Sequence, residues 1–157
     1  MPTKQIQIGD QITAAFMMFD QNKNEINSEH LKGKRVLLSF HPLAWTGVCA
    51  KQMQSLEQNY DHFQKLNVVP LGVSVDSVPS KKAWAASLAI ERVSLLADFW
   101  PHGQLAKELG VFFKEKGFSQ RANILLDENH KVIFKKIYDL SKVPDLKEIF
   151  HFLETED

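Results

Sequence analysis

The only cysteine in the sequence, Cys49, lies in a stretch that combines a thiol with residues able to change its reactivity. The stretch reads HPLAWTGVCAKQM (residues 41–53), with Pro42 seven residues and Thr46 three residues before the cysteine. If Thr46 is the N-cap of a helix, Cys49 is the third helical residue, where free backbone N–H groups and the helix dipole favour an anion. The expected species at this position is therefore a thiolate, the nucleophilic form of cysteine.

Apolar side chains follow Cys49 at helical spacing and predict a helix that ends near Leu66. The members of this stripe are Cys49, Met53, Leu56, Tyr60, Phe63 and Leu66. The stripe turns Cys49 inward, so the sulfur is expected at the floor of a pocket, and Pro42, with no N–H and a fixed φ, suits a lid over it. A lone cysteine is most often a small buried hydrophobe, and its position alone does not decide between the two interpretations.

The remaining segments predict the elements that must position this cysteine. Strands are expected at residues 35–40, 68–76 and 94–98, helices at 77–90, 103–110 and from Pro144 onward, and a hairpin over 121–139. This order predicts an α/β fold with a central mixed β-sheet flanked by helices, extended at the N-terminus by one or two short strands. Ligands of such sheets bind beyond the carboxyl ends of strands, and Cys49 follows the strand that ends at Phe40.

Length and composition narrow the class of protein. A chain of 157 residues with 44% apolar and 24% charged residues is expected to form a single domain over residues 1–157. Lysine plus arginine equal aspartate plus glutamate at 19 each, so we expect neither a nucleic-acid nor a membrane partner. The first ten residues lack a secretory signal, and one cysteine cannot form an internal disulfide. A cytoplasmic protein is the simplest expectation.

The pattern Pro-x-x-x-Thr-x-x-Cys, present as Pro42, Thr46 and Cys49, resembles the active-site motif of the peroxiredoxins. Other strings extend this resemblance from about residue 9 to residue 139: VSVDS with the following AWA, RANILLD, and LLADFWPHGQLAKELGVF, which is similar to the alkyl hydroperoxide reductase E-type branch. The resemblance implies a thioredoxin-like fold and thiol-dependent reduction of hydrogen peroxide and organic hydroperoxides, with no cofactor.

The resemblance also implies a role for each matching residue. Cys49 is implied as the peroxidatic nucleophile, which becomes a sulfenic acid, and Thr46 as a hydrogen-bonding partner of the sulfur or the peroxide. Pro42 is implied as a shield against water and Arg121 as the group that holds the thiolate and polarises the O–O bond. Arg121 opens a predicted strand, although a lone arginine is also commonly a solvated surface charge.

The rate gained by ionising the thiol is too small to explain a fast peroxidase. A free cysteine, with a pKa of about 8.5, is roughly 3% ionised at pH 7, so complete ionisation raises its rate only about thirty-fold. A more acidic thiol is also a weaker nucleophile, which reduces the gain. A fast peroxidase must therefore use Arg121, Thr46 and backbone N–H groups to stabilise the charge that develops on the departing oxygen.

With one cysteine, the expected cycle is of the one-Cys type, in which an external thiol attacks oxidised Cys49. The reductant is expected to be a low-molecular-weight thiol or a thioredoxin- or glutaredoxin-like protein, and a homodimer is the default assembly. The alternative function is a peroxide sensor or redox relay, in which oxidised Cys49 acts on a partner protein and turns over slowly. A thioredoxin-like disulfide oxidoreductase would need a Cys-x-x-Cys pair, and Gln52 occupies the second position.

His41 stands where many members of the resembled family carry an aromatic residue. We expect either a surface imidazole at a strand end or, beside the pocket, a group that titrates near pH 6–7. The spacing of His41, Cys49 and His102 matches no zinc motif, so no metal site is expected.

Overall fold

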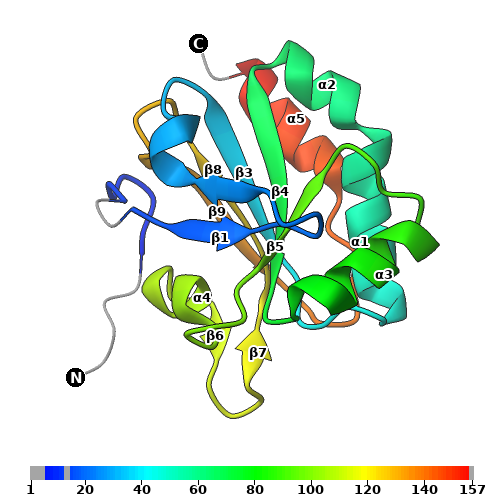
Figure 1. The fold of residues 1–157 in the computed structure, drawn as a ribbon. Helices are drawn as coiled ribbons and strands as arrows, with labels where there is room; N and C mark the ends of the chain where they lie inside the picture. The colour runs from blue at the N-terminus through cyan, green and yellow to red at the C-terminus, as the bar shows by residue number, and fades with distance from the viewer. Residues whose placement is uncertain (1–5, 13–14, 156–157) are drawn as a thin grey trace.

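A five-stranded mixed sheet forms the centre of the computed structural model, which describes residues 6–12 and 15–155 (Figure 1). Its strands, in spatial order, are β5 (Ser94–Ala97), β4 (Val68–Ser74), β3 (Arg35–Phe40), β8 (Arg121–Leu126) and β9 (Val132–Tyr138). The first three are parallel to one another, and β8 and β9 are antiparallel to their neighbours. The predicted mixed sheet and its hairpin over residues 121–139 are thereby confirmed.

Helices and a small hairpin cover the two faces of the sheet (Figure 1). One face packs against α1 (Gly47–Gln58), α2 (Tyr60–Lys65), α3 (Val78–Ser87) and α5 (Leu146–Thr155). The other carries the antiparallel pair β1 (Met17–Phe19) and β2 (Glu25–Asn27), the 3-10 helix η1 (Ser28–Leu31) and α4 (Gln104–Glu108). A short ribbon of β6 (Phe112–Phe113) and β7 (Phe118–Ser119), which the sequence patterns did not predict, completes the fold.

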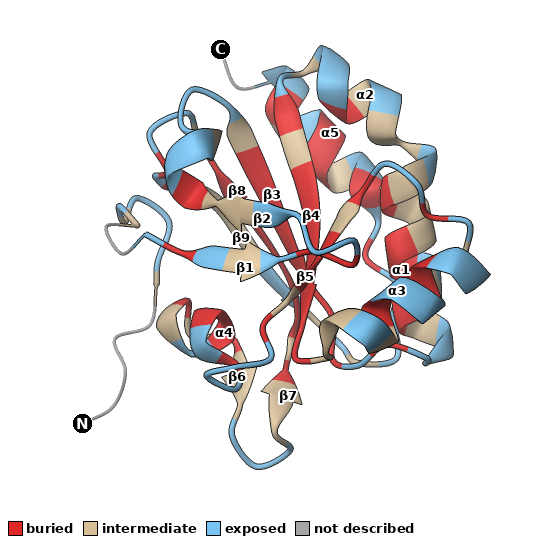
Figure 2. Cartoon of the chain, viewed as in Figure 1, coloured by how far each residue is buried: buried red, intermediate tan, exposed pale blue. Residues whose placement is uncertain are grey.

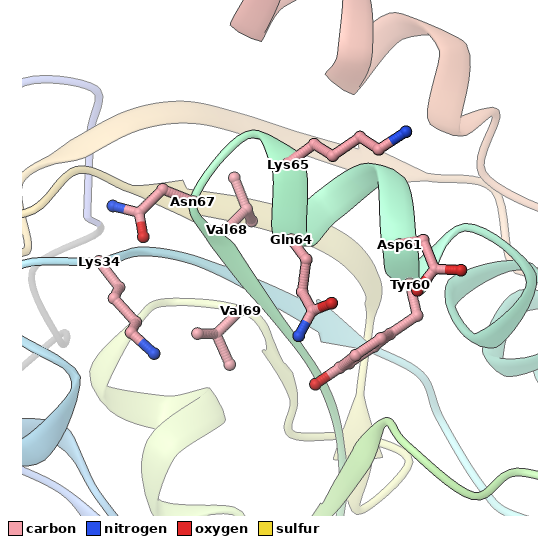
Figure 3. A pocket seen from close by; sticks show the side chains of 8 residues that line it. All are labelled: Lys34, Tyr60, Asp61, Gln64, Lys65, Asn67, Val68 and Val69. Carbon is pink, nitrogen blue, oxygen red and sulfur yellow. The ribbon is translucent and has the colours of Figure 1, made fainter.

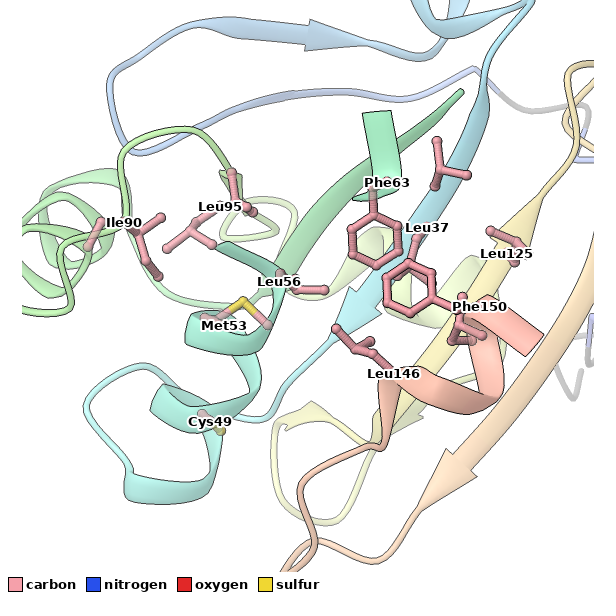
Figure 4. Close-up of a cluster of buried hydrophobic side chains, with 14 of the residues drawn as sticks. Leu37, Cys49, Met53, Leu56, Phe63, Ile90, Leu95, Leu125, Leu146 and Phe150 are labelled. Carbon is pink, nitrogen blue, oxygen red and sulfur yellow. The ribbon is translucent and has the colours of Figure 1, made fainter. Parts of the chain in front are cut away.

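The alternation of side chains along the central strands decides which residues meet the helices. Leu37 of β3 and Leu125 of β8 belong to the core beneath α1 and α5 (Figure 4). Because side chains alternate between faces, Ser39, Asn123 and Arg121 lie on this same face, nearer the carboxyl end of β3. These central strands are buried along almost their whole length (Figure 2). The sheet therefore offers polar groups to the start of α1 from an otherwise apolar surface.

The prediction of a single helix up to Leu66 is wrong, because the chain forms two helices that are separated at Asn59. The Asn59 side-chain amide donates to the Ser55 carbonyl at 2.8 Å, and the Ser55 hydroxyl donates to the Gln52 carbonyl at 2.6 Å. Side chains that hydrogen-bond backbone carbonyls in this way compete with the helical N–H groups. The apolar stripe nevertheless continues across the break, because Leu56 and Phe63 belong to one buried cluster.

Other predicted boundaries agree with the structure to within a few residues. The α3 helix begins after Ser77, whose hydroxyl accepts the Ser80 N–H, and it ends at Ser87 rather than at the predicted Ile90. Pro70 lies within β4, and β5 pairs with β4 only from Leu71 onward. Among the helices that the structure describes, none has both the length and the apolar character needed to cross a membrane.

Gly72 of β4 lies where the sheet and α1 approach closely. A Cβ atom at this position would collide with the Met53 sulfur and lie 2.8 Å from a Leu95 methyl carbon. Gly72→Ala is therefore expected to lower the free energy of unfolding by about 1–3 kcal/mol, the usual cost of overpacking a core. Urea unfolding checks this, with Gly47→Ala as the matched control because a Cβ at Gly47 meets nothing within 4 Å. Equal stabilities of the two variants would contradict the prediction.

Candidate active site

The predicted start of the helix at Thr46 is confirmed. Thr46 is the N-cap residue, in an extended conformation, and Cys49 is the third residue of α1. The Thr46 hydroxyl, however, makes no capping bond to the helix and donates to the Leu43 carbonyl at 2.9 Å. With its proton directed to that carbonyl, the hydroxyl oxygen keeps its lone pairs for an incoming donor. Cys49 is only 1% exposed and lies at the end of the buried cluster with Met53 (Figure 4).

Arg121 is the group that the structure brings to the sulfur. It is 3% exposed, so the alternative of a solvated surface charge is wrong, and its Nη1 donates to Cys49 Sγ at 3.3 Å. The same Nη1 donates to Gln52 Oε1 at 2.7 Å. From the other side of the guanidinium, Nε and Nη2 donate to the Leu140 carbonyl at 3.3 and 2.8 Å. The planar group is thus held by α1 and by the loop after β9, with one N–H directed at the sulfur.

Gln52 connects Arg121 to a chain of buried polar groups. Its side-chain amide donates to Ser39 Oγ at 2.8 Å and to the Phe40 carbonyl at 3.1 Å, and Ser39 Oγ donates to Asn123 Oδ1 at 2.8 Å. The chain continues through the Tyr138 hydroxyl, which donates to Glu148 of α5. Burial and this Glu148 contact raise the pKa of Tyr138, so the phenol keeps its proton and remains a donor.

The loop between β3 and α1 is fixed by contacts to the neighbouring elements. The Ala44 N–H donates to Asp76 Oδ2 at 2.8 Å, and the Trp45 indole donates to Ser80 Oγ at 3.2 Å. Trp45 itself has a left-handed backbone with φ 66° and is 57% exposed. Pro42 is buried in this loop, close in sequence to the end of β3. Of the predicted site residues, the structure brings Arg121 and Cys49 into contact, while the Thr46 hydroxyl is bonded to the loop.

His41 differs from both expectations drawn from the sequence. Its side chain is fully buried, so it is not a surface imidazole. Burial, the nearby charge of Lys81 and that of Arg121 lower the pKa of His41 well below its usual value, so it does not titrate near pH 6–7. The alternation of Leu37, Ser39 and His41 along one face of the strand is the signal that could have predicted this burial.

Lys81 is a buried basic residue that the sequence patterns considered above do not predict. Lys81, Trp84 and Ala85 are buried together on α3, at spacings of three and four residues that place them on one helical face. This spacing is the signal that could have identified Lys81 as an inward-facing residue.

A surface hollow of about 650 Å³ lies at the amino end of β4 (Figure 3). It is open to solvent and is lined by Lys34, Tyr60, Asp61, Gln64, Lys65, Asn67, Val68 and Val69. Cys49 and Arg121 are not among these residues, and the hollow lies at the opposite end of the parallel strands from the start of α1. The Cys49 sulfur and the Arg121 guanidinium are therefore not associated with this hollow.

Gln52→Met is expected to remove the polar centre of the site while keeping its volume. Arg121 and Ser39 would each lose a partner, and a buried group left unsatisfied costs about 1–3 kcal/mol of stability. The reaction rate of Cys49 with hydrogen peroxide should fall about tenfold, because Arg121 loses one of the contacts that direct it at the sulfur. Stopped-flow kinetics and urea unfolding measure the two effects.

The matched control for Gln52→Met is Gln58→Met, at an exposed glutamine on the same helix. We expect the control to change neither the rate nor the stability. A Gln52→Met variant that behaves like this control would show that the buried network does not support Arg121.

Three comparisons with known proteins agree with one another. The model of the AhpC/TSA family matches residues 8–135. An alkyl hydroperoxide reductase E of Mycobacterium tuberculosis is 32% identical over 131 residues, which cover 83% of this chain and 85% of that protein. A thiol peroxidase of Streptococcus agalactiae is 29% identical over 136 residues, covering 87% and 80%.

Solved structures show the same likeness. The crystal structure of Enterococcus faecalis AhpC superposes with a TM-score of 0.85 at 27% identity, covering 94% of this chain and 90% of that one. The structure of a reduced 2-Cys peroxiredoxin of Plasmodium vivax gives a TM-score of 0.82 at 28% identity, covering 94% and 80%. The fold is therefore the thioredoxin-like α/β fold that the motif implied.

Proposed function

The chain belongs to the AhpC/TSA family of peroxiredoxins, and from this premise we propose that Cys49 reduces hydroperoxides in a one-Cys, thiol-dependent peroxidase cycle. The observation that carries the proposal is the contact between Arg121 Nη1 and Cys49 Sγ at 3.3 Å, at the third residue of α1. A guanidinium and a helix start both favour a thiolate there. Relatives named as a reductase and a peroxidase favour turnover over the alternative of a sensor.

In the proposed step, the Cys49 thiolate attacks the terminal oxygen of ROOH. The new S–O bond forms as the O–O bond breaks, and the electron pair of that bond leaves on the alkoxide, which takes up a proton to give ROH. Arg121 donates to the oxygens as charge passes from sulfur to the leaving group, and the free lone pairs of Thr46 accept the peroxide O–H. Pro42, buried and without an N–H, limits the access of water.

The reductant must be an external thiol, because the sequence contains no second cysteine. That thiol attacks the sulfenic sulfur, releases water and leaves a mixed disulfide, which a second thiol resolves. Since Cys49 is 1% exposed, the first turn of α1 must open before a bulky thiol reaches the sulfur. A low-molecular-weight thiol or a thioredoxin- or glutaredoxin-like protein fits this role.

We also propose a cytoplasmic location and a homodimer. A cycle that consumes reduced thiols needs a compartment that keeps thiols reduced, such as the cytosol. Exposed apolar residues near the start of α1, Leu43 and Trp45, offer surface for a second copy. Sedimentation analysis reports the oligomeric state.

Mass spectrometry of the protein after one equivalent of hydrogen peroxide tests the proposed cycle. We expect Cys49 to gain one oxygen, and to form a mixed disulfide when a small thiol is present during the reaction. A protein that gains no oxygen at Cys49 under these conditions would overturn the proposal.

A further inference from the structure

Lys81 of α3 and His41 after β3 are basic side chains that the proposed cycle does not use. Both are completely buried, and neither Lys81 Nζ nor His41 Nε2 has a hydrogen-bond partner among the residues described. Burying an ammonium without a hydrogen-bond partner is costly, and buried polar groups are nearly always satisfied. A cationic Lys81 therefore requires compensation from charges nearby.

Both side chains lie on the same face of the sheet as the sulfur. The His41 and Trp84 rings are 5.4 Å apart, and Trp84, one turn after Lys81 on α3, shares a buried cluster with Cys49. Phe40 pairs with Ala122 in the adjoining strand, so His41 lies at the level of Arg121. His41, Lys81 and Cys49 are thus all buried on the helix-covered face of the sheet that holds Trp84.

Three acidic groups, Asp76, Cys49 and Asp98, stabilise the ammonium form of Lys81 when they are ionised. Burial lowers the pKa of Lys81 to about 7, and these three anions oppose that decrease. Burial, then the charges of Lys81 and Arg121, keep His41 neutral by lowering its pKa. Of these two basic residues, only Lys81 therefore carries charge. At neutral pH its ammonium and neutral amine forms are populated to similar extents.

The two carboxylates have partners of their own. Asp76 accepts from the Ala44 N–H and the Ser74 hydroxyl, and Asp98 accepts from the N–H groups of Leu105 and Ala106 at 3.0 Å each. Neither carboxylate takes part in the peroxide reaction. Of the three anions that act on Lys81, only Cys49 loses its charge when it reacts.

We propose that Lys81 is a positioning residue whose proton follows the charge of Cys49: the buried ammonium forms while the sulfur is a thiolate and loses its proton when the sulfur becomes a neutral sulfenic acid. This inference rests on the proposed peroxidase cycle. As the O–O bond breaks, the departing alkoxide takes one proton from water, and Lys81 returns one proton to water. The buried site thereby loses a cation when one of the three anions that stabilise it is lost.

Thermodynamic linkage makes the proposal testable from both sides. If the thiolate strengthens proton binding at Lys81 by some factor, the Lys81 proton must favour the thiolate by the same factor. Opposite charges at close range shift each other's ionisation by about tenfold or more. A purely structural lysine would not produce equal factors in two separate titrations.

The first titration follows the ultraviolet absorbance of the Cys49 thiolate against pH. Lys81→Met is expected to move this ionisation to higher pH, with about tenfold weaker thiolate formation. Lys82→Met is the matched control, because Lys82 is the exposed neighbour on the same helix, and it should titrate like the wild type.

The second titration follows proton binding at Lys81 by carbon-13 NMR of labelled lysine side chains. The reduced protein is compared with Cys49→Ser, whose hydroxyl is neutral, and proton binding at Lys81 should be about tenfold weaker in the serine variant. Equal proton binding in the two proteins would overturn the proposal, as would a Lys81→Met variant that ionises Cys49 like the wild type.

The NMR comparison decides the question even if Lys81→Met does not fold. Failure of the peroxidase proposal would look different, because Cys49 would then gain no oxygen from peroxide while both titrations stay measurable.

Discussion

Arg121→Lys is expected to lower the second-order rate constant for hydrogen peroxide by about 10²–10³, the usual effect of removing one donor that stabilises a developing oxyanion. The guanidinium contacts Cys49, Gln52 and the Leu140 carbonyl at once, through three different nitrogens. A lysine ammonium is a point charge on a flexible stem and cannot bridge these partners in a fixed plane. The charge remains, but its direction toward the breaking O–O bond is lost.

The size of this loss separates two explanations of the site. Complete ionisation of an ordinary thiol raises the rate at pH 7 only about thirty-fold, so a change in thiolate content explains at most that much. Stopped-flow rates and thiolate titrations of Arg121→Lys should therefore disagree, with the rate falling much further than the thiolate content. Arg92→Lys, at a half-exposed arginine in a surface ion pair, is the control and should change neither. Equal losses of rate and thiolate would show that Arg121 acts only by charging the sulfur.

Cys49→Ser is expected to abolish peroxide reduction by the protein. Only the uncatalysed reaction between the small thiol and peroxide in buffer should remain. A serine hydroxyl in place of the thiol is not ionised at neutral pH, and the sequence offers no other cysteine to replace it. The variant should fold, because the serine side chain is only slightly smaller than that of cysteine. Arg121 can also donate to the serine hydroxyl oxygen. Consumption of a small thiol in the presence of peroxide measures the loss, and circular dichroism checks the fold. Retained turnover would place the chemistry elsewhere in the chain.

The positions of the main elements follow from local patterns that the sequence shows directly. The run Arg35 to Phe40 has the apolar content of a buried strand, and Thr46 with the stripe after Cys49 predicts the start of α1 at its observed residue. The helix break at Asn59 was not predictable from the stripe, because apolar spacing continues through it. It depends on which carbonyls the Ser55 and Asn59 side chains bond.

The sequence names candidate residues for the site but does not predict how their side chains bond. The motif predicts Pro42, Thr46 and Cys49 as site residues, and the resemblance of the strand RANILLD predicts Arg121. The bond from the Thr46 hydroxyl to Leu43 depends on loop geometry that spacing does not encode. The burial of Lys81 arises because α3 packs against the sheet beside Trp84, which is a tertiary property. Because charged residues on a helix are usually solvated, the residue type of Lys81 alone predicts exposure and not burial.

In the proposed mechanism, Arg121 and the start of α1 hold a thiolate and stabilise the charge that leaves with the departing oxygen. The most direct test is the stopped-flow rate constant of the reduced wild-type protein with hydrogen peroxide, measured beside free cysteine at the same pH and corrected for thiolate content. We expect Cys49 to react at least about a hundredfold faster than the free thiolate, since even one oriented donor contributes that much. A Cys49 thiolate that reacts no faster than the thiolate of free cysteine would contradict it.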